Sequence, residues 1–314
     1  MDRLEAMSIL VAAVEAGSLS AAGRKVGVPL PTVSRKISEL ETYLHTRLLV
    51  RSTRRLALTD AGAAYVAVCR RILEEVSEAE RAAAGEYRMP RGGLVVAAPV
   101  AFGRMHVLPA INDFLARFPE IDVRLILSDR NVDLIEDHVD MAVRIGALPD
   151  SSMVATRAGF LRRVVCGSPG FFADYRTPTV PADLSDLPCV TFDILGSAAS
   201  WRFKTLKSKA EQAVAVHSRL AVNTAEAAID AAVAGVGITR VLSYQAAHAL
   251  RAGKLRIVLE AFEPEPIPVN LLHAARGLLP LKMRSFLDFA APRLRGGLSA
   301  VAGAVSNGAD ASVA

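Results

Sequence analysis

The sequence predicts an α+β protein of several domains: a small basic helical unit at the amino terminus, one long helix, and a larger α/β region. Three observations support this order. Residues 18–59 hold eight arginines and lysines against two glutamates, a net charge of +6, whereas the whole chain of 314 residues carries +5. Residues 59–89 contain no proline and repeat apolar side chains at helical spacing. Beyond residue 92, short apolar runs alternate with amphipathic segments, which is typical of α/β sheets.

The basic unit has the pattern of three short helices and a hairpin. A first amphipathic helix spans residues 2–16 and is expected to pack in the core through Leu4, Met7, Val11 and Val14. Ser18 or Ser20 can cap a second helix, and Gly27 ends it because glycine takes positive φ without strain. A third helix from about Pro31 to Tyr43 repeats apolar residues on one face, and residues 48–58 predict a wing with a basic tip. Together these elements predict a helix-turn-helix followed by a wing.

The charge of this unit predicts contact with a DNA duplex. Short polar and cationic side chains at a helix start suit base edges in the major groove, and wing arginines suit phosphates or the minor groove. A single arginine could equally be a solvated surface charge, but eight cations in one unit favour the duplex. The residues expected at DNA are Ser20, Leu30, Pro31, Thr32, Ser34, Arg35, Lys36, Arg51, Thr53, Arg54 and Arg55.

Residues 59–89 predict one long helix with a coiled-coil-like seam. A small winged helix cannot cover a seam of that length, so we expect the same helix of a second subunit as its partner. The chain then reaches Pro90, Gly92 and Gly93, which predict a linker. The expected dimerisation residues are Tyr65, Val68, Ile72, Val76 and Ala79.

The region from residue 90 to 295 predicts parallel sheets, because strands alternate with helices. The expected strands are 94–98, 123–127, 141–145, 162–166, 189–192 and a segment after Gly237, and the expected helices are 107–118, 132–138 and 225–234. Residues 296–314 are rich in glycine, alanine and serine and predict a disordered tail.

Several motifs, standing in the right order, resemble LysR-type transcriptional regulators. They are Ala16-Gly17-Ser18, Val33-Ser34-Arg35, Leu40-Glu41, Leu58-Thr59, Ala61-Gly62, Ala98-Pro99-Val100-Ala101-Phe102-Gly103, Asp140-Met141-Ala142-Val143-Arg144-Ile145-Gly146 and Ala234-Gly235-Val236-Gly237-Ile238. One departure is Pro29-Leu30, where the family commonly has Ser-Gln. A capping hydroxyl and a base-reading amide are therefore missing. The operator sequence of this chain cannot be inferred from the operators of members that keep these two groups.

The resemblance covers about residues 1–295 and implies the domain order. It implies a winged helix-turn-helix DNA-binding domain at 1–58, a linker and dimerisation helix at 59–89, and an effector-binding domain at 90–295 similar to periplasmic binding proteins. Lobe I of that domain would comprise 92–162 and 266–292, and lobe II 163–265. The implied partners are double-stranded operator DNA, further copies of the chain in a homodimer or homotetramer, a small-molecule effector, and RNA polymerase as a further candidate. The implied function is a one-component regulator whose operator binding or promoter activity responds to that effector.

An effector between the lobes would contact residues at strand ends. Ligands in such sheets bind beyond the carboxyl ends of strands, where helix amino termini offer free amides. Arg144 and the amides near Val100 could together hold a carboxylate, or Arg144 could be a structural ion-pair partner, for instance of Asp140. Asn223 and Thr224 could instead only end a strand. The expected effector-binding residues are Pro99, Val100, Ala101, Ser128, Arg144, Gly146, Asn223 and Thr224.

Catalytic, metal and cofactor sites are not predicted. Arg240 stands where a dinucleotide fingerprint needs its third glycine, residues 166–170 do not fit G-x-S-x-G, and the six histidines and three cysteines lack ligand spacing. The charged residues at 2–5 exclude an ordinary secretory signal, and no apolar run approaches the roughly 20 residues of a membrane span, so we expect a cytoplasmic protein.

Two other functions remain open on the sequence alone. One is a solute-binding or enzymatic α/β domain whose winged helix contacts only protein. The other is an architectural DNA binder that senses no ligand.

Overall fold

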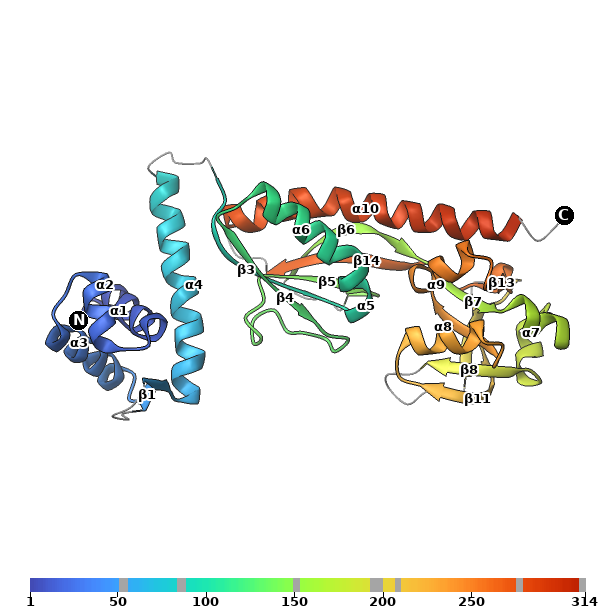
Figure 1. Ribbon diagram of the computed structural model, residues 1–314, viewed down its shortest axis with the longest axis horizontal. Coiled ribbons are helices and arrows are strands. Elements are labelled where there is room, and N and C mark those ends of the chain that lie inside the picture. Colours follow the sequence, from blue (N-terminus) through green and yellow to red (C-terminus); the bar gives the residue numbers. More distant parts are fainter. Residues whose placement is uncertain are drawn as a thin grey trace.

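The computed structural model describes residues 1–50, 56–83, 89–148, 153–192, 200–206, 210–274 and 279–310. A helical amino-terminal domain leads into the long helix α4, and two α/β lobes follow, with helix α10 lying along both of them (Figure 1).

The amino-terminal domain consists of three helices, a short wing and the start of α4. The Asp2 carboxylate and the Ser18 hydroxyl each accept a hydrogen bond from an amide three residues on, at 3.2 and 3.1 Å. Of the two serines that could cap the second helix, Ser18 is the one that does so. Gly17 and Gly27 end the first two helices at positive φ. The elements are α1 (Arg3–Ala16), α2 (Leu19–Val26), α3 (Leu30–Tyr43), β1 (Leu49–Val50), β2 (Ala57–Leu58) and α4 (Asp60–Ala83).

The core of this domain lies beneath α3. Val33, Ile37 and Leu40 are buried there, as the sequence spacing predicts. The predicted inner face of α1 is wrong in part, because Leu4 is 42% exposed while α1 buries Ala6, Ile9, Leu10, Ala12 and Ala13 instead. The small alanine side chains let α1 approach its neighbours closely, so the contact face turns toward them. Val66 of α4 completes the core.

Lobe I is built on a five-stranded mixed sheet of strand order β4-β3-β5-β14-β6. β3 pairs parallel with β4 and β5, whereas β14 pairs antiparallel with β5 and β6. Buried aromatic rings of Phe102, Phe114 and Phe286 fill the core between this sheet and its helices. The elements are β3 (Gly92–Ala98), α5 (Val100–Phe102), the π-helical turn η1 (Gly103–Val107), α6 (Leu108–Arg117), β4 (Ile121–Leu127), β5 (Met141–Ile145), β6 (Met153–Leu161), β14 (Ile267–Ala274) and α10 (Leu281–Asp310).

Lobe II has a second mixed sheet of order β11-β8-β12-β7-β13 and a separate hairpin, β9-β10. β8 pairs parallel with β11 and β12, and β7 pairs antiparallel with β12 and β13. The hairpin adds Trp201 and Phe203 to the core. The elements are β7 (Arg163–Gly167), α7 (Pro169–Asp174), the 3-10 helix η2 (Pro181–Ser185), β8 (Pro188–Phe192), β9 (Ser200–Lys204), β10 (Glu211–Ala215), β11 (His217–Val222), α8 (Ala225–Val233), β12 (Ile238–Leu242), α9 (Ser243–Arg251), β13 (Arg256–Val258) and the 3-10 helix η3 (Glu260–Phe262).

The chain crosses between the lobes twice, and one arginine joins the two crossings. Arg162 lies between β6 and β7 on the outward crossing. Its guanidinium donates to the carboxylates of Glu260 and Glu263, on the return crossing, at 2.7 Å each. The two connecting segments are therefore held side by side.

Two secondary-structure predictions for this region are wrong. The sheets are mixed rather than parallel, because each lobe receives strands that run back after a crossing. Residues 132–138 form turns rather than a helix. There the Asp133 carboxylate accepts hydrogen bonds from the amides of Ile135 and Glu136, and the Asp137 carboxylate accepts one from the amide of Asp133. Such local side-chain bonds compete with a helix, and His138 ends the turns at a φ of 53°.

The predicted disordered tail is also wrong for residues 296–310, which continue α10. Leu294, Leu298 and Val301 share one helical face at spacings of four and three. Leu298 is 4% exposed and contacts Gly159 of β6, and Val301 packs against the apolar clusters of both lobes. Burial of this apolar face therefore keeps the segment helical, although its composition is typical of disordered chains. Residues 311–314 lie outside the described residues.

Candidate functional site

The first turns of α3 form an exposed face on the amino-terminal domain. Pro29 precedes the helix without a side-chain cap, and its carbonyl accepts from the amides of Thr32 and Val33 at 2.9 and 3.2 Å. Leu30, Pro31, Ser34 and Arg35 are exposed, Thr32 is half-buried, and Ser20 is exposed on α2. Short polar groups, one apolar side chain and a cation thus stand together on a surface that could enter a groove.

The two cations of this helix have different surroundings. Arg35 is 62% exposed and pairs with Glu39 one turn later, with 2.6 Å between nitrogen and oxygen. Lys36 is only 14% exposed and is bonded to the carboxylate of Glu5 on α1. Arg35 can exchange its solvated partner for a phosphate or a base at little cost. Lys36 fastens α3 to α1, and its contact with DNA stays a prediction.

The wing is anchored to α3 by one carboxylate. Glu41 Oε1 accepts hydrogen bonds from the amides of Leu48 and Leu49 at 2.8 and 3.1 Å. Arg51, Thr53, Arg54 and Arg55, the predicted wing contacts, lie outside the described residues. The base of the wing is therefore fixed to the carboxyl-terminal end of α3.

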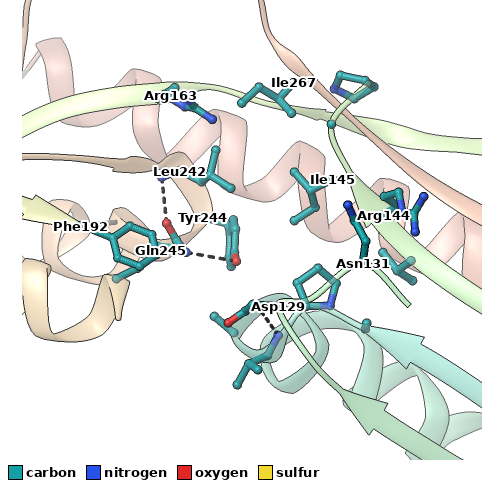
Figure 2. A pocket seen from close by; sticks show the side chains of 18 of the residues that line it. Asp129, Asn131, Arg144, Ile145, Arg163, Phe192, Leu242, Tyr244, Gln245 and Ile267 are labelled. Atoms are coloured by element: carbon teal, nitrogen blue, oxygen red, sulfur yellow. Dashed lines mark hydrogen bonds between the residues drawn. The ribbon is translucent and has the colours of Figure 1, made fainter. Parts of the chain in front are cut away.

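A cavity of about 630 Å³ lies between the two lobes (Figure 2). Its volume falls within the range typical of small-molecule sites. Lobe II contributes Arg163, Phe192, Leu242 and Tyr244, and apolar side chains such as Ile145 and Ile267 come from lobe I. All eight predicted effector-binding residues line it, namely Pro99, Val100, Ala101, Ser128, Arg144, Gly146, Asn223 and Thr224.

The polar groups that the sequence offered for a carboxylate have partners within the chain. The Val100 amide donates to the Asp129 carboxylate at 3.0 Å. Arg144 donates to the Val132 carbonyl at 3.1 Å, so it fastens the turn after β4 and forms no ion pair with Asp140. Thr224 caps α8 by accepting from the amide of Ala227. Asn223 is exposed beside it.

Several lining residues were not predicted from the sequence. Gln245 accepts from the amide of Leu242 at 2.9 Å and donates to the Tyr244 hydroxyl at 3.3 Å, which holds Tyr244 against the cavity (Figure 2). Burial of this tyrosine raises the pKa of its hydroxyl, which keeps it a neutral hydrogen-bonding group. Arg163 enters from the first strand of lobe II. The sequence feature that could have identified Arg163 is its position directly after the predicted boundary between lobe I and lobe II.

Helix α4 carries the predicted dimerisation residues. Tyr65 packs against the amino-terminal core, Val68, Ile72 and Val76 are half-buried, and Ala79 is exposed. Val66 and Cys69 face the winged helix and are buried. The self-association of this seam stays a prediction.

Metal ligands do not cluster in the described residues, where no group of three histidine, cysteine or acidic side chains could hold an ion. The three cysteines are free and buried. Over the same residues, no helix is both long enough and apolar enough to span a bilayer.

Comparison with known proteins assigns both regions. Residues 4–63 match the family described as "Bacterial regulatory helix-turn-helix protein, lysR family", and residues 88–295 match "LysR substrate binding domain". A helix-turn-helix transcriptional regulator of Xanthomonas campestris pv. campestris is 35% identical over 91% of this chain and 84% of its own length. A helix-turn-helix transcriptional repressor of Pseudomonas aeruginosa is 34% identical over 92% of this chain and 91% of its own.

A solved full-length structure shows the same architecture. CrgA, a LysR-type transcriptional regulator from Neisseria meningitidis, has a TM-score of 0.59 and 29% identity, over 92% of this chain and 98% of its own. These families and relatives are regulators of transcription rather than enzymes, and regulators of this kind bind DNA and form oligomers. The predicted fold class, a winged helix-turn-helix followed by a two-lobed α/β domain, is confirmed. The chain therefore belongs to the LysR family of bacterial transcriptional regulators.

Proposed function

We propose that this regulator binds its operator sequence-specifically as a homodimer or homotetramer, and that a small-molecule effector in the interlobe cavity changes that binding or the activity of the promoter. The observation that carries the proposal is the position of the cavity between two lobes, one of which is bonded directly to helix α4. RNA polymerase is a further candidate partner in promoter control. A protein with this role would work in the cytoplasm, where the DNA lies.

Operator recognition is assigned to the exposed start of α3. Leu30, Thr32, Ser34 and Arg35 present an apolar group, two hydroxyls and a guanidinium, which are the groups that read thymine methyls and base edges. Arg51, Arg54 and Arg55 of the wing would add sequence-independent phosphate contacts. Ser20 of α2 would support the docking against the backbone.

The connection to α4 passes through a buried lysine of α10. The Lys282 ammonium is 6% exposed and donates to Glu74 of α4 at 2.6 Å and to the Gly93 carbonyl of β3 at 2.5 Å. Glu74 lies so close to β3 that a Cβ added at Gly92 would stand 1.9 Å from its carboxylate oxygen. Lobe I and α4 are therefore fastened at this point, next to the linker.

Helix α10 extends this connection along the molecule. Lys282 lies in its first turn. The helix then packs on β6 of lobe I and reaches α9 and β13 of lobe II (Figure 1). A ligand that changes the relation of the lobes would act on α10 and, through Lys282, on α4. If the lobes have two arrangements, the ligand shifts the equilibrium between them by the difference in its binding free energy for the two. The two recognition helices of a dimer would then be repositioned on DNA.

The DNA-binding half of the proposal is tested by fluorescence anisotropy. The full chain is titrated onto a duplex from its own upstream region and onto a scrambled duplex of equal length. We expect a preference for the upstream duplex that Arg35→Ala reduces by about 1–3 kcal/mol, because one base-reading group is lost. Arg117→Ala, an exposed arginine on α6, is the matched control. Equal binding of both duplexes by the unmutated protein would contradict sequence-specific recognition.

The sensing half is tested by thermal unfolding of the full chain against a panel of metabolites. A ligand present at 100 times its Kd stabilises the native state by about 2.7 kcal/mol. We expect at least one class of compound to raise the melting temperature and to change operator affinity. Stabilisation by none of them would contradict effector sensing and favour a purely architectural role.

A further inference from the structure

Two arginines lie side by side on the lobe II face that meets the cavity. In the antiparallel pair β7-β12, Arg163 stands opposite Leu242, and Val165 stands opposite Arg240. Residues two apart on a strand share a face, and so do residues directly opposite each other. Arg163 and Arg240 are therefore diagonal neighbours on one face. Arg163 lines the cavity itself, and its side chain is seen at the cavity wall in Figure 2.

These two cations are partly shielded from water, and neither forms an ion pair with a described residue. Both are only partly exposed. Arg240 stacks on the ring of Trp201 at 5.4 Å and donates to a backbone carbonyl, that of Arg202, at 3.0 Å. Burial and the neighbouring charge of Arg163 lower the pKa of Arg240 to about 9. The guanidinium of Arg163 has neither a hydrogen bond nor an ion pair with any described residue.

The adjacent residue, Arg162, has a structural role and differs from Arg163 in its partners. Arg162 is bonded to two carboxylates, and these raise the pKa of its guanidinium. Arg163 has no such partner among the described residues. Burial lowers its pKa, and Glu211 offsets this effect only from a distance. Glu211 itself is exposed and lies 4.0 Å from Arg202. Glu211 acts on Arg240 in the same way, without an ion pair to either arginine. Like charges held together without a bonded carboxylate favour the entry of an anion.

The other charged groups of the cavity are occupied or solvated. Arg144 is bonded to the Val132 carbonyl, and Asp129 accepts from the Val100 amide. The remaining lining charges, which are exposed, are Arg130, Arg202, Glu211, Glu226 and Glu265. The lining also includes apolar side chains, namely Ala97, Ala98, Ile145, Phe192, Leu242 and Ile267.

We propose that the effector class is a small carboxylate with an apolar body, whose anionic group is held by Arg163 while Arg240 behind it adds positive potential. The planar fork of Arg163 would bind both carboxylate oxygens, and the apolar lining would cover the body. This inference rests on the proposed effector site and specifies its chemistry. It moves the anion contact from Arg144 in lobe I to Arg163 in lobe II.

The test uses ligands that differ only in charge. The full-length protein is titrated by calorimetry and by thermal unfolding with benzoate, benzamide and benzylamine, and with hexanoate, hexanamide and hexylamine. We expect an acid of at least one series to bind, and its amide and amine to bind at least about tenfold more weakly, as the loss of a charge-assisted bond implies. Arg163→Gln should weaken the acid by about tenfold or more, and Arg163→Lys by less because it keeps the charge. Arg219→Gln, an exposed arginine of the same sheet, is the control.

The carboxylate inference is overturned if amides bind as well as acids, if none of the acids binds, or if Arg163→Gln leaves the affinity for the acid unchanged. The anisotropy titration on the same preparations separates this failure from failure of the proposed function. If an amide or an amine binds and alters operator affinity, the proposed effector site is supported and only the assignment of a carboxylate ligand is rejected. If the protein lacks any operator preference, the proposed function itself falls.

Discussion

At the scale of single residues, two glutamates on α3 show how differently the same carboxylate can act. Glu41 Oε1 accepts from two wing amides at 2.8 and 3.1 Å in a partly buried position. Glu39, two residues earlier, pairs with the exposed Arg35 across one helical turn. Only the first of these leaves buried backbone donors unsatisfied when it is removed.

We therefore expect Glu41→Ala to lower the free energy of unfolding of the amino-terminal domain by about 1–3 kcal/mol. Glu39→Ala should lower it by only about 0.3–0.5 kcal/mol, because its partner is a solvated pair of the i,i+4 type. Urea unfolding of the full chain, followed by circular dichroism, measures both changes. Equal losses for the two variants would contradict the anchoring role of Glu41.

The cavity arginines show what sequence can predict at this scale. Arg144 was predicted from its motif and does line the cavity, but its bond to Val132 joins β5 to the turn after β4, and these two strands lie on either side of β3. The sequence near Arg144 does not show that arrangement. Arg163 stands beside Arg162 in the sequence, and nothing local separates the two. Their different surroundings arise from alternation along β7 and from carboxylates about 100 residues later.

At the scale of elements, buried strands were the most predictable part of the fold. The strand predicted at 141–145 has the bounds Met141–Ile145, and that at 94–98 gains only two residues, because continuous apolar runs mark buried strands. Strands β6, β9, β10, β13 and β14 were missed, and β11 was foreseen only in that Asn223 and Thr224 could end a strand. The antiparallel direction of β14 also depends on a second crossing between lobes, which local patterns do not contain.

Helix α10 carries the sharpest test at this scale. Leu298 is 4% exposed against β6, whereas the next residue, Ser299, is exposed. Leu298→Ala should lower the free energy of unfolding by about 2–5 kcal/mol, since it leaves a cavity in lobe I. Ser299→Ala should change it by less than about 0.5 kcal/mol. A neutral result for Leu298→Ala in thermal or urea unfolding would mean that residues beyond 296 do not pack as described.

At the scale of the whole molecule, α4 holds the central position. One face buries Val66 and Cys69 on the winged helix, and Glu74 reaches Lys282 in the effector domain. The half-buried seam of Val68, Ile72 and Val76 is the proposed contact with a second subunit. Under the proposed function, this one helix would join DNA reading, ligand sensing and assembly. Sequence spacing predicted the seam, but the bond to Lys282 joins residues 208 positions apart and could not be foreseen.

The most direct test of this account is a hydroxyl-radical footprint of the full chain on its own upstream region. A dimer that places two α3 helices on one face of the duplex predicts two protected half-sites, about one helical turn or a multiple of it apart. Ile72→Glu, which buries a charge in the seam, should reduce the protection to a weak single half-site, and the exposed Glu75→Ala should leave both half-sites intact. Uniform protection along the duplex, or two half-sites that persist in Ile72→Glu, would contradict a dimeric, sequence-specific regulator assembled through α4.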